Sequence, residues 1–297
     1  EKAMFHYNKA LSIYIQSVGS SHVDVAKTQN YIGIVLEQQG KFDEALEMYE
    51  TSLKTKIQAF GSCHVRVANT EGNIGSLLIN MGDFENALFH LQKALEIYLK
   101  SVGPSHASVA STEMNIGIVL ESMGDYENAL LHLQKALEIF VQAFDHSHAS
   151  VADTYLNMGV VEDKLGNFEK ALELYEKALE IFLKCHGPAH VKVALTHNNI
   201  GKVYLHLADF EKAMFHYNKA QSIYIPSVGS SHESAAVTNN NIGEVCCHIG
   251  DYEKAMFHYN KALSIYIQSV GSSHVDVAKT QNYIGIVLEQ QGKFDEA

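Results

Sequence analysis

Apolar residues in this chain recur at helical spacing in two successive blocks, and the pair of blocks returns every 42 residues. In one copy the first block runs from about Val67 to Asn80 and the second from about Phe84 to Ser101. Both blocks place apolar side chains three and four residues apart, the spacing that gathers them on one face of a helix. The pattern predicts two amphipathic helices per repeat, each with one buried stripe.

Glycines divide the repeat in the same way. Glycine inside a helix costs up to about 1 kcal/mol relative to alanine, so each glycine within a first helix predicts a second helix packed closely against it. Other glycines stand where helices should end, and suit the left-handed residue that closes a helix. Ser21 with Asp24 is typical of a capping box, and Pro226 should bend or shorten its second helix. The glycines within first helices, each after Ile or Met, are Gly33, Gly75, Gly117, Gly159, Gly201, Gly243 and Gly285.

These features resemble the tetratricopeptide repeat. The family's Leu-Gly pair corresponds to Ile74-Gly75, its small second-helix residues to Ala87 and Ala94, and its turn glycine to Gly82. The family's early tryptophan is absent, and the unit is about eight residues longer than the usual 34. This longer form is similar to the repeats of kinesin light chain and nephrocystin-like proteins. The resemblance implies an all-α fold, a right-handed superhelical α-solenoid of antiparallel helix pairs.

A longer periodicity lies over the repeat. Residues 1–45 are identical to residues 253–297, an offset of six repeats. The two ends of the chain are identical in sequence and fall at nearly the same position of the repeat. Both observations favour the interpretation that the chain is a fragment of a longer array of repeats. We expect residues 1–297 to form a single solenoid of partial and full repeats, with boundaries at 1–25, 26–67, 68–109, 110–151, 152–193, 194–235, 236–277 and 278–297.

Composition narrows the partners. The formal net charge is -12 and the chain has a single arginine, Arg66, so nucleic acid, which requires clustered cations, is disfavoured as a partner. No apolar stretch is long enough to span a membrane, and the first residues show no signal-peptide pattern. The cysteines, which lack CxxC spacing, predict neither a zinc site nor a disulfide framework. We therefore expect a cytoplasmic protein without a cofactor.

Histidine is abundant, with 17 residues. Most recur once per repeat, at a loop position such as His64 or at a second-helix position such as His90. A zinc site needs three or four converging ligands, so capping of the loops and packing at the core edge are the favoured roles. The chain has no nucleophile-elbow, phosphate-loop or zinc-protease motif. We expect a protein that is not an enzyme.

The resemblance places ligands on the concave surface, which first-helix residues line. A row of asparagines occupies one first-helix position, where a side-chain amide could pair with a peptide backbone or tie one repeat to the next. The sequence leaves both roles open. Because the neighbouring positions show no paired basic residues, a clamp for acidic tails is disfavoured. The predicted groove residues are Asn73, Asn115, Asn157, Asn199, Asn241, Ser76, Asn80, Ile118, Glu121, Val160, Lys164, Lys202, His206, Glu244 and His248.

The function that these observations predict is a protein-protein interaction scaffold, whose concave groove binds a peptide or a partner helix. The alternative is an architectural spacer or filament, in which near-identical repeats associate head to tail. A sensor array attached to a signalling ATPase or a similar domain is a third reading.

Overall fold

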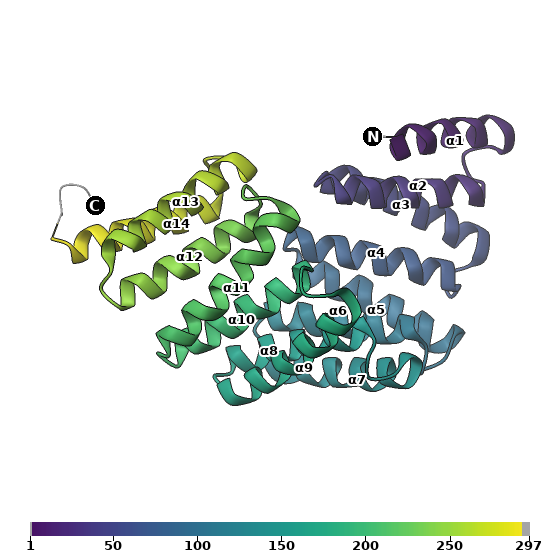
Figure 1. Cartoon of the computed structure of the whole chain (residues 1–297). Helices are drawn as coiled ribbons and strands as arrows, with labels where there is room; N and C mark the ends of the chain where they lie inside the picture. Colours follow the sequence, from purple (N-terminus) through teal and green to yellow (C-terminus); the bar gives the residue numbers. More distant parts are fainter. Residues whose placement is uncertain (1, 293–297) are drawn as a thin grey trace. The chain divides into compact units, whose positions relative to one another are not determined.

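The computed structural model describes residues 2–292, and in this range its regular secondary structure is entirely α-helical (Figure 1). By its internal contacts the chain divides into two compact units, Glu1–His146 and Ser147–Ala297. The helices of the first unit are α1 (Lys2–Val18), α2 (Val23–Gln38), α3 (Phe42–Phe60), α4 (Val65–Met81), α5 (Phe84–Ser101), α6 (Ala107–Ser122) and α7 (Tyr126–Phe144). Those of the second unit are α8 (Ala149–Lys164), α9 (Phe168–His186), α10 (Val191–His206), α11 (Phe210–Val228), α12 (Glu233–His248), α13 (Tyr252–Val270) and α14 (Val275–Gln290).

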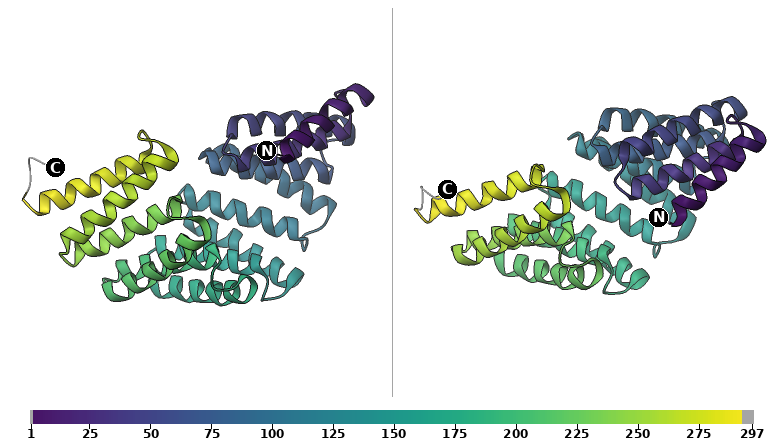
Figure 2. Two further views of the ribbon diagram at one scale, coloured as in Figure 1. Left: turned by 45° about the horizontal axis from the view of Figure 1, so that its top comes forward. Right: turned by 90° about the horizontal axis from the view of Figure 1, so that it is seen from above.

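Within each unit, helices that follow one another in the chain pack side by side in chain order (Figure 2). Even-numbered helices are the first helices of the repeats, and odd-numbered helices are the second helices. The all-α helical-repeat fold is confirmed. The 42-residue phase also holds, although the predicted repeat boundaries at residues such as 26 and 68 fall inside first helices. That residues 1–297 form a single solenoid stays a prediction.

The helix ends agree closely with the apolar pattern. The second helix predicted at Phe84–Ser101 is α5, with the same bounds, whereas the first helix, predicted at Val67–Asn80, is α4, Val65–Met81. Of the two effects predicted for Pro226, shortening of its helix is wrong, and bending stays a prediction. Helix α11 continues through Pro226 to Val228 and has 19 residues, as does α13, which lacks the proline. Only one backbone hydrogen bond is lost so close to the helix end.

Close contact between the two helices of a repeat explains the glycines inside the first helices. A Cβ atom on Gly75 would lie 2.6 Å from Cγ of Leu91, and one on Gly201 would lie 2.8 Å from Cδ1 of Tyr217. Gly72, also inside α4, has open space around it. The backbone of the first helix therefore touches a large second-helix side chain at one fixed position, because no side chain separates them.

Each first helix begins with a histidine cap. His64 has extended backbone angles, and its Nδ1 accepts the backbone N–H of Arg66 at 3.1 Å. The predicted capping box at Ser21 is wrong, because His22 is the cap and accepts from the N–H of Asp24. The capping role predicted for the loop histidines is confirmed at His22, His64, His106, His148, His190, His232 and His274.

Twelve glycines with positive φ close helices, and two copies of the repeat use another residue there. Asp145 (φ 91°) replaces the glycine after a second helix, and Ala208 (φ 57°) replaces the glycine after a first helix. The Asp209 N–H donates to the Tyr204 carbonyl at 2.9 Å, the bond that closes a Schellman motif. A side chain in this left-handed conformation is strained, so Ala208 destabilises its own turn.

The same sequence is buried differently in two places. Residues of α1 and α13 are identical over Lys2–Val18, yet α1 buries none of its side chains, whereas α13 buries Tyr259, Ala262 and Tyr266 among others. Helix α13 packs against both α12 and α14, whereas α1 packs against α2. Burial in this fold therefore comes from the neighbouring helices rather than from the sequence of a helix alone.

Candidate protein-binding surface

The first helices of neighbouring repeats contact one another directly: α4 contacts α6 in the first unit, and α10 contacts both α8 and α12 in the second. Helix pairs in a solenoid are joined more closely on the inner side of the curve than on the outer side. The first-helix faces therefore form the inner surface of each unit, which is where the predicted groove residues lie.

Three of the five predicted asparagines bond to the preceding repeat. Nδ2 of Asn73 donates to Oδ1 of Asn30 at 3.3 Å, and Nδ2 of Asn115 donates to Oγ of Ser76 at 3.1 Å. In the second unit, Nδ2 of Asn241 donates to Oδ1 of Asn198 at 3.1 Å. Each of these contacts ties neighbouring first helices together.

The other two asparagines differ from these three. Asn157 and Asn199 are partly exposed, and within the described part of the second unit neither of them has a hydrogen-bond partner. Their amides keep both a donor and an acceptor for a ligand. The row of asparagines is therefore mixed, with linking amides at three positions and unused amides at two.

A carboxylate near the end of a first helix makes a second link between repeats. Oε1 of Glu37 accepts from Nδ2 of Asn80 at 3.1 Å. Asp163, whose side chain is only 4% exposed, contacts Nζ of Lys202 at 3.1 Å and Nδ1 of His206 at 3.0 Å. The structure thus joins two of the predicted groove residues around a buried carboxylate, and the charge of Lys202 is partly neutralised there.

The remaining predicted positions contribute a mixed surface. All of them are at least partly exposed on their first helices, and His248 also stacks on Phe210 with ring centroids 5.4 Å apart. This set comprises Ile118, Glu121, Val160, Lys164, Glu244 and His248.

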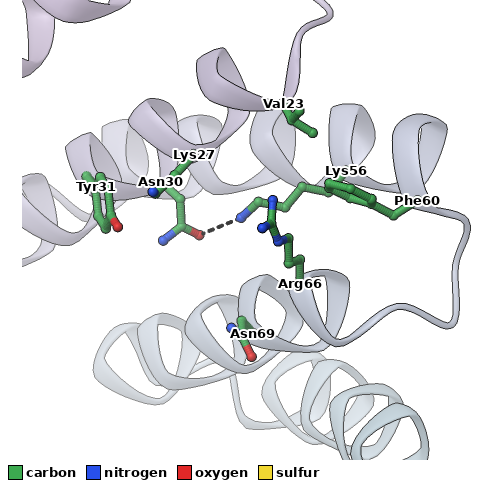
Figure 3. Close-up of a pocket in the computed structure, with 8 residues that line it drawn as sticks. All are labelled: Val23, Lys27, Asn30, Tyr31, Lys56, Phe60, Arg66 and Asn69. Carbon is green, nitrogen blue, oxygen red and sulfur yellow. Dashed lines mark hydrogen bonds between the residues drawn. The ribbon is translucent and has the colours of Figure 1, made fainter. Parts of the chain in front are cut away.

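The first unit also contains a basic pocket, which the groove prediction missed. It has a volume of about 230 Å³ and lies between α2, α3 and α4 (Figure 3). None of its cations belongs to the predicted groove positions, and Lys56 comes from a second helix. In the other complete repeats an aromatic residue such as Tyr98 or Phe182 takes the place of Lys56. Comparing the repeats position by position could have found it. The lining residues are Val23, Lys27, Asn30, Tyr31, Lys56, Phe60, Arg66 and Asn69.

Lys56 lies at the bottom of this pocket and is only 7% exposed. Its Nζ donates to Oγ1 of Thr70 at 2.6 Å and to Oδ1 of Asn30 at 3.4 Å. Burial, and then the positive charge of Arg66, lower the pKa of Lys56 to about 8. Burying an ammonium group without a carboxylate partner costs free energy. The positive charge in this pocket is not neutralised by a carboxylate among the described residues.

A polar pair recurs inside several repeats, between the first and second helix. In the first unit it joins a carboxylate to a histidine, with Oε2 of Glu71 2.5 Å from Nδ1 of His90. In the second unit His197 and His216 face each other, with their Nδ1 atoms 3.0 Å apart. Burial, and then the neighbouring His197, lower the pKa of His216 to about 4. These pairs are partly buried at the core edge, in agreement with the predicted packing role of the second-helix histidines.

No cluster of three or more His, Cys, Asp or Glu side chains within residues 2–292 is arranged to hold a metal ion. No helix in the range has the length and apolar character needed to cross a bilayer. The four cysteines are free.

A family model described as tetratricopeptide repeat matches residues 2–58, 66–142, 150–225 and 234–297. The chain belongs to the tetratricopeptide repeat family. The matches cover nearly all of the sequence, so every helix pair described above is part of a tetratricopeptide-like repeat. A comparison with curated proteins found no match.

Solved structures of low sequence identity share the fold. BtubC (BKLC) from P. vanneervenii is 20% identical, with a TM-score of 0.63 over 75% of this chain and 90% of that one. Nearly identical TPR-like repeats of a putative kinesin light chain from Podosopora anserina are 15% identical, with a TM-score of 0.56 over 70% and 98%. The STAND protein PH0952 from Pyrococcus horikoshii, which has a tetratricopeptide repeat sensor, is 17% identical, with a TM-score of 0.65 over 91% and 39%.

Proposed function

We propose that this tetratricopeptide-repeat chain is a non-enzymatic scaffold, which binds a peptide or a partner helix along its first-helix faces. The family in general mediates protein-protein interaction. The observation that carries the proposal for this chain is the row of partly exposed amides on those faces, two of which, Asn157 and Asn199, are unused. A free amide can donate to one peptide group and accept from the next, whatever the side chains of the ligand.

The surface around these amides fits a moderately polar ligand. Exposed Glu244 and His248 lie on α12 and apolar Val160 lies on α8, with α10 between these helices. Lys202 on α10 is only partly neutralised by Asp163. The charge of -12 makes this a poor surface for nucleic acid. A partner would therefore be recognised by backbone hydrogen bonds and scattered side-chain contacts. A cytoplasmic setting stays a prediction.

The test begins with a random linear peptide library selected on the full chain. Affinities of the selected peptides are then measured for the wild type, for Asn157→Ala/Asn199→Ala and for Asn218→Ala, a matched asparagine exposed on a second helix. We expect the double variant to lose about thirty-fold in affinity with an unchanged melting temperature, because two hydrogen bonds of about 1 kcal/mol each are removed. Equal affinities for all three proteins would contradict the proposal, as would a failure to select any peptide.

Head-to-tail self-association is a second candidate, and one repeated contact favours it. Tyr7 stacks on Tyr31 with ring centroids 5.5 Å apart and planes at 26°, and Tyr259 stacks on Tyr283 with the same values. The same contact between a second helix and the next first helix is thus built twice from identical sequence. A second copy of the chain could therefore add to the end of the first with its repeats in register. Light scattering over a concentration series tests this, because a mass that stays at 32.9 kDa would exclude the assembly.

A further inference from the structure

The polar groups that line the basic pocket of the first unit are mostly unused hydrogen-bond donors. Asn30 directs its Oδ1 to Lys56, and Asn69 accepts the Tyr98 hydroxyl through Oδ1 at 2.7 Å. Both side-chain NH2 groups are therefore left without an acceptor among the described residues that face the pocket. The guanidinium of Arg66 points toward the ammonium of Lys56 (Figure 3). Lys27 is a third cation at the exposed rim, with Nζ 5.9 Å from the ring centre of Tyr31.

The corresponding place in the second unit shows that this excess of positive charge is specific to the pocket. There Phe182 occupies the position of Lys56, and Asp153 occupies that of Lys27. Lys192, which corresponds to Arg66, contacts both carboxylate oxygens of Asp153, at 2.5 and 2.6 Å. The second unit thus supplies its own anion, whereas over residues 2–292 none of the three cations of the first-unit pocket has an ion-pair partner.

We infer that the pocket formed by Lys27, Lys56, Arg66, Asn30 and Asn69 binds a dianionic phosphate group. Buried Lys56 lies at its bottom and exposed Arg66 and Lys27 line its more open part, so a single carboxylate would leave positive charge uncompensated. A phosphomonoester carries a charge of about -1.5 to -2 and three acceptor oxygens, which suit a guanidinium fork, an ammonium and amide donors from three helices. A volume of about 230 Å³ holds a phosphorylated side chain or a free ion, and is below the roughly 300–1,000 Å³ of sites for larger ligands.

The group has two possible sources. A phosphoserine or phosphothreonine on a bound peptide would rest on the proposed scaffold function, whereas binding of inorganic phosphate would not. Measuring both separates failure of the pocket from failure of the scaffold proposal.

The repeats supply variants with a high prospect of folding. Lys56→Phe introduces the residue that Phe182 provides in the second unit, and Arg66→Ser introduces the residue found at Ser108. Arg66 is exposed, so Arg66→Ser keeps the test valid even where Lys56→Phe disturbs folding. Lys192→Ser is the matched control, because it removes the corresponding cation from the second unit.

The experiment follows the Arg66 Nε–H and the Asn30 and Asn69 side-chain amides by NMR at pH 7.5 and low salt. Four probes are titrated into the full chain: inorganic phosphate, a blocked pentapeptide with a central phosphoserine, and the same peptide with glutamate or serine. We expect saturable shifts with phosphate, with the phosphopeptide or with both, at least about ten-fold weaker binding in Lys56→Phe and Arg66→Ser, and no change in Lys192→Ser.

The relative affinity of the two phosphate probes identifies the source, because either one binding supports a phosphate pocket. Tighter binding of the phosphopeptide points to a phosphorylated partner, and tighter binding of inorganic phosphate points to the free ion. The inference is overturned by the absence of saturable shifts, by unchanged affinity in both pocket variants, or by a glutamate peptide that binds as tightly as the phosphopeptide.

Discussion

The pair of histidines inside the fifth helix pair should make the second unit sensitive to acid. His197 and His216 share one hydrogen bond between their Nδ1 atoms, so one ring donates, the other accepts, and both cannot be charged. Tyr204 stacks on His216 with ring centroids 5.6 Å apart. Burial, and then the charge of Lys219, lower the pKa of His197. No carboxylate among the described contacts offsets these effects. Replacing His197 by glutamate would install the carboxylate that Glu71 supplies to His90.

The magnitude follows from the pKa of His216, which lies at about 4 compared with 6.5 for the free side chain. A depressed histidine pKa means that the unfolded chain binds more protons, so stability is full above about pH 6.5 and is lost as the pH falls toward 4. One pKa unit corresponds to about 1.4 kcal/mol, which gives a loss of roughly 2 kcal/mol between pH 7 and 5. Solvent screening at this partly exposed site reduces it to roughly 1 kcal/mol.

In His197→Glu the sign should reverse. A carboxylate beside His216 favours the imidazolium and raises its pKa, so the stabilisation is present below pH 6.5 and fades as the pH rises through the new value. Urea unfolding at pH 5 and pH 7.5, with NMR titration of His216, measures both effects. The control is His197→Tyr/His216→Leu, which copies the Tyr155 and Leu174 pair. Two results would refute this reasoning. One is a His216 pKa near 6.5 in the wild type, and the other is a stability difference between the wild type and His197→Glu that is the same at both pH values.

Two backbone predictions each have a matched control. Ala208→Gly should stabilise the protein by about 1 kcal/mol, because it removes an alanine from a left-handed conformation. Gly166→Ala is the reverse change one repeat earlier and should destabilise the protein by at least as much. Urea unfolding of both variants checks that the two changes in stability have opposite signs. Gly201→Ala should cost about 1–3 kcal/mol, because its Cβ would lie 2.8 Å from Cδ1 of Tyr217. Gly72→Ala, inside a helix with open space, should gain up to about 1 kcal/mol, and equal melting temperatures for these two variants would disprove the packing argument.

The fold could be predicted from the sequence because every local signal recurs with one period. Apolar spacing located the helix Val65–Met81 to within two residues. The glycine period predicted a close helix approach at Gly75, and the structure shows that Leu91 makes it. Periodicity also explains what was missed. Standard capping preferences name Ser, Thr, Asp and Asn, so they point to Ser21 at a helix start where the cap is His22.

The candidate site was less predictable, because it depends on exceptions to the repeat. Lys56 belongs to a second helix and enters the pocket only where an aromatic residue is missing. Whether an asparagine links repeats depends on what the preceding repeat offers: Asn73 finds Asn30, and Asn241 finds Asn198. Such pairings join residues about one repeat apart, and only the register between neighbouring helices determines them.

The central claim, that a ligand lies along the first-helix faces, is tested most directly by site-specific cross-linking. A benzophenone amino acid is placed at Ile118 on first helix α6, or at Leu131 on second helix α7, which is 60% exposed. Each protein is irradiated with a peptide selected from the random library. We predict a covalent adduct at position 118 that excess unlabelled peptide abolishes, and none at position 131. Competable cross-linking at 131 without cross-linking at 118 would contradict the account.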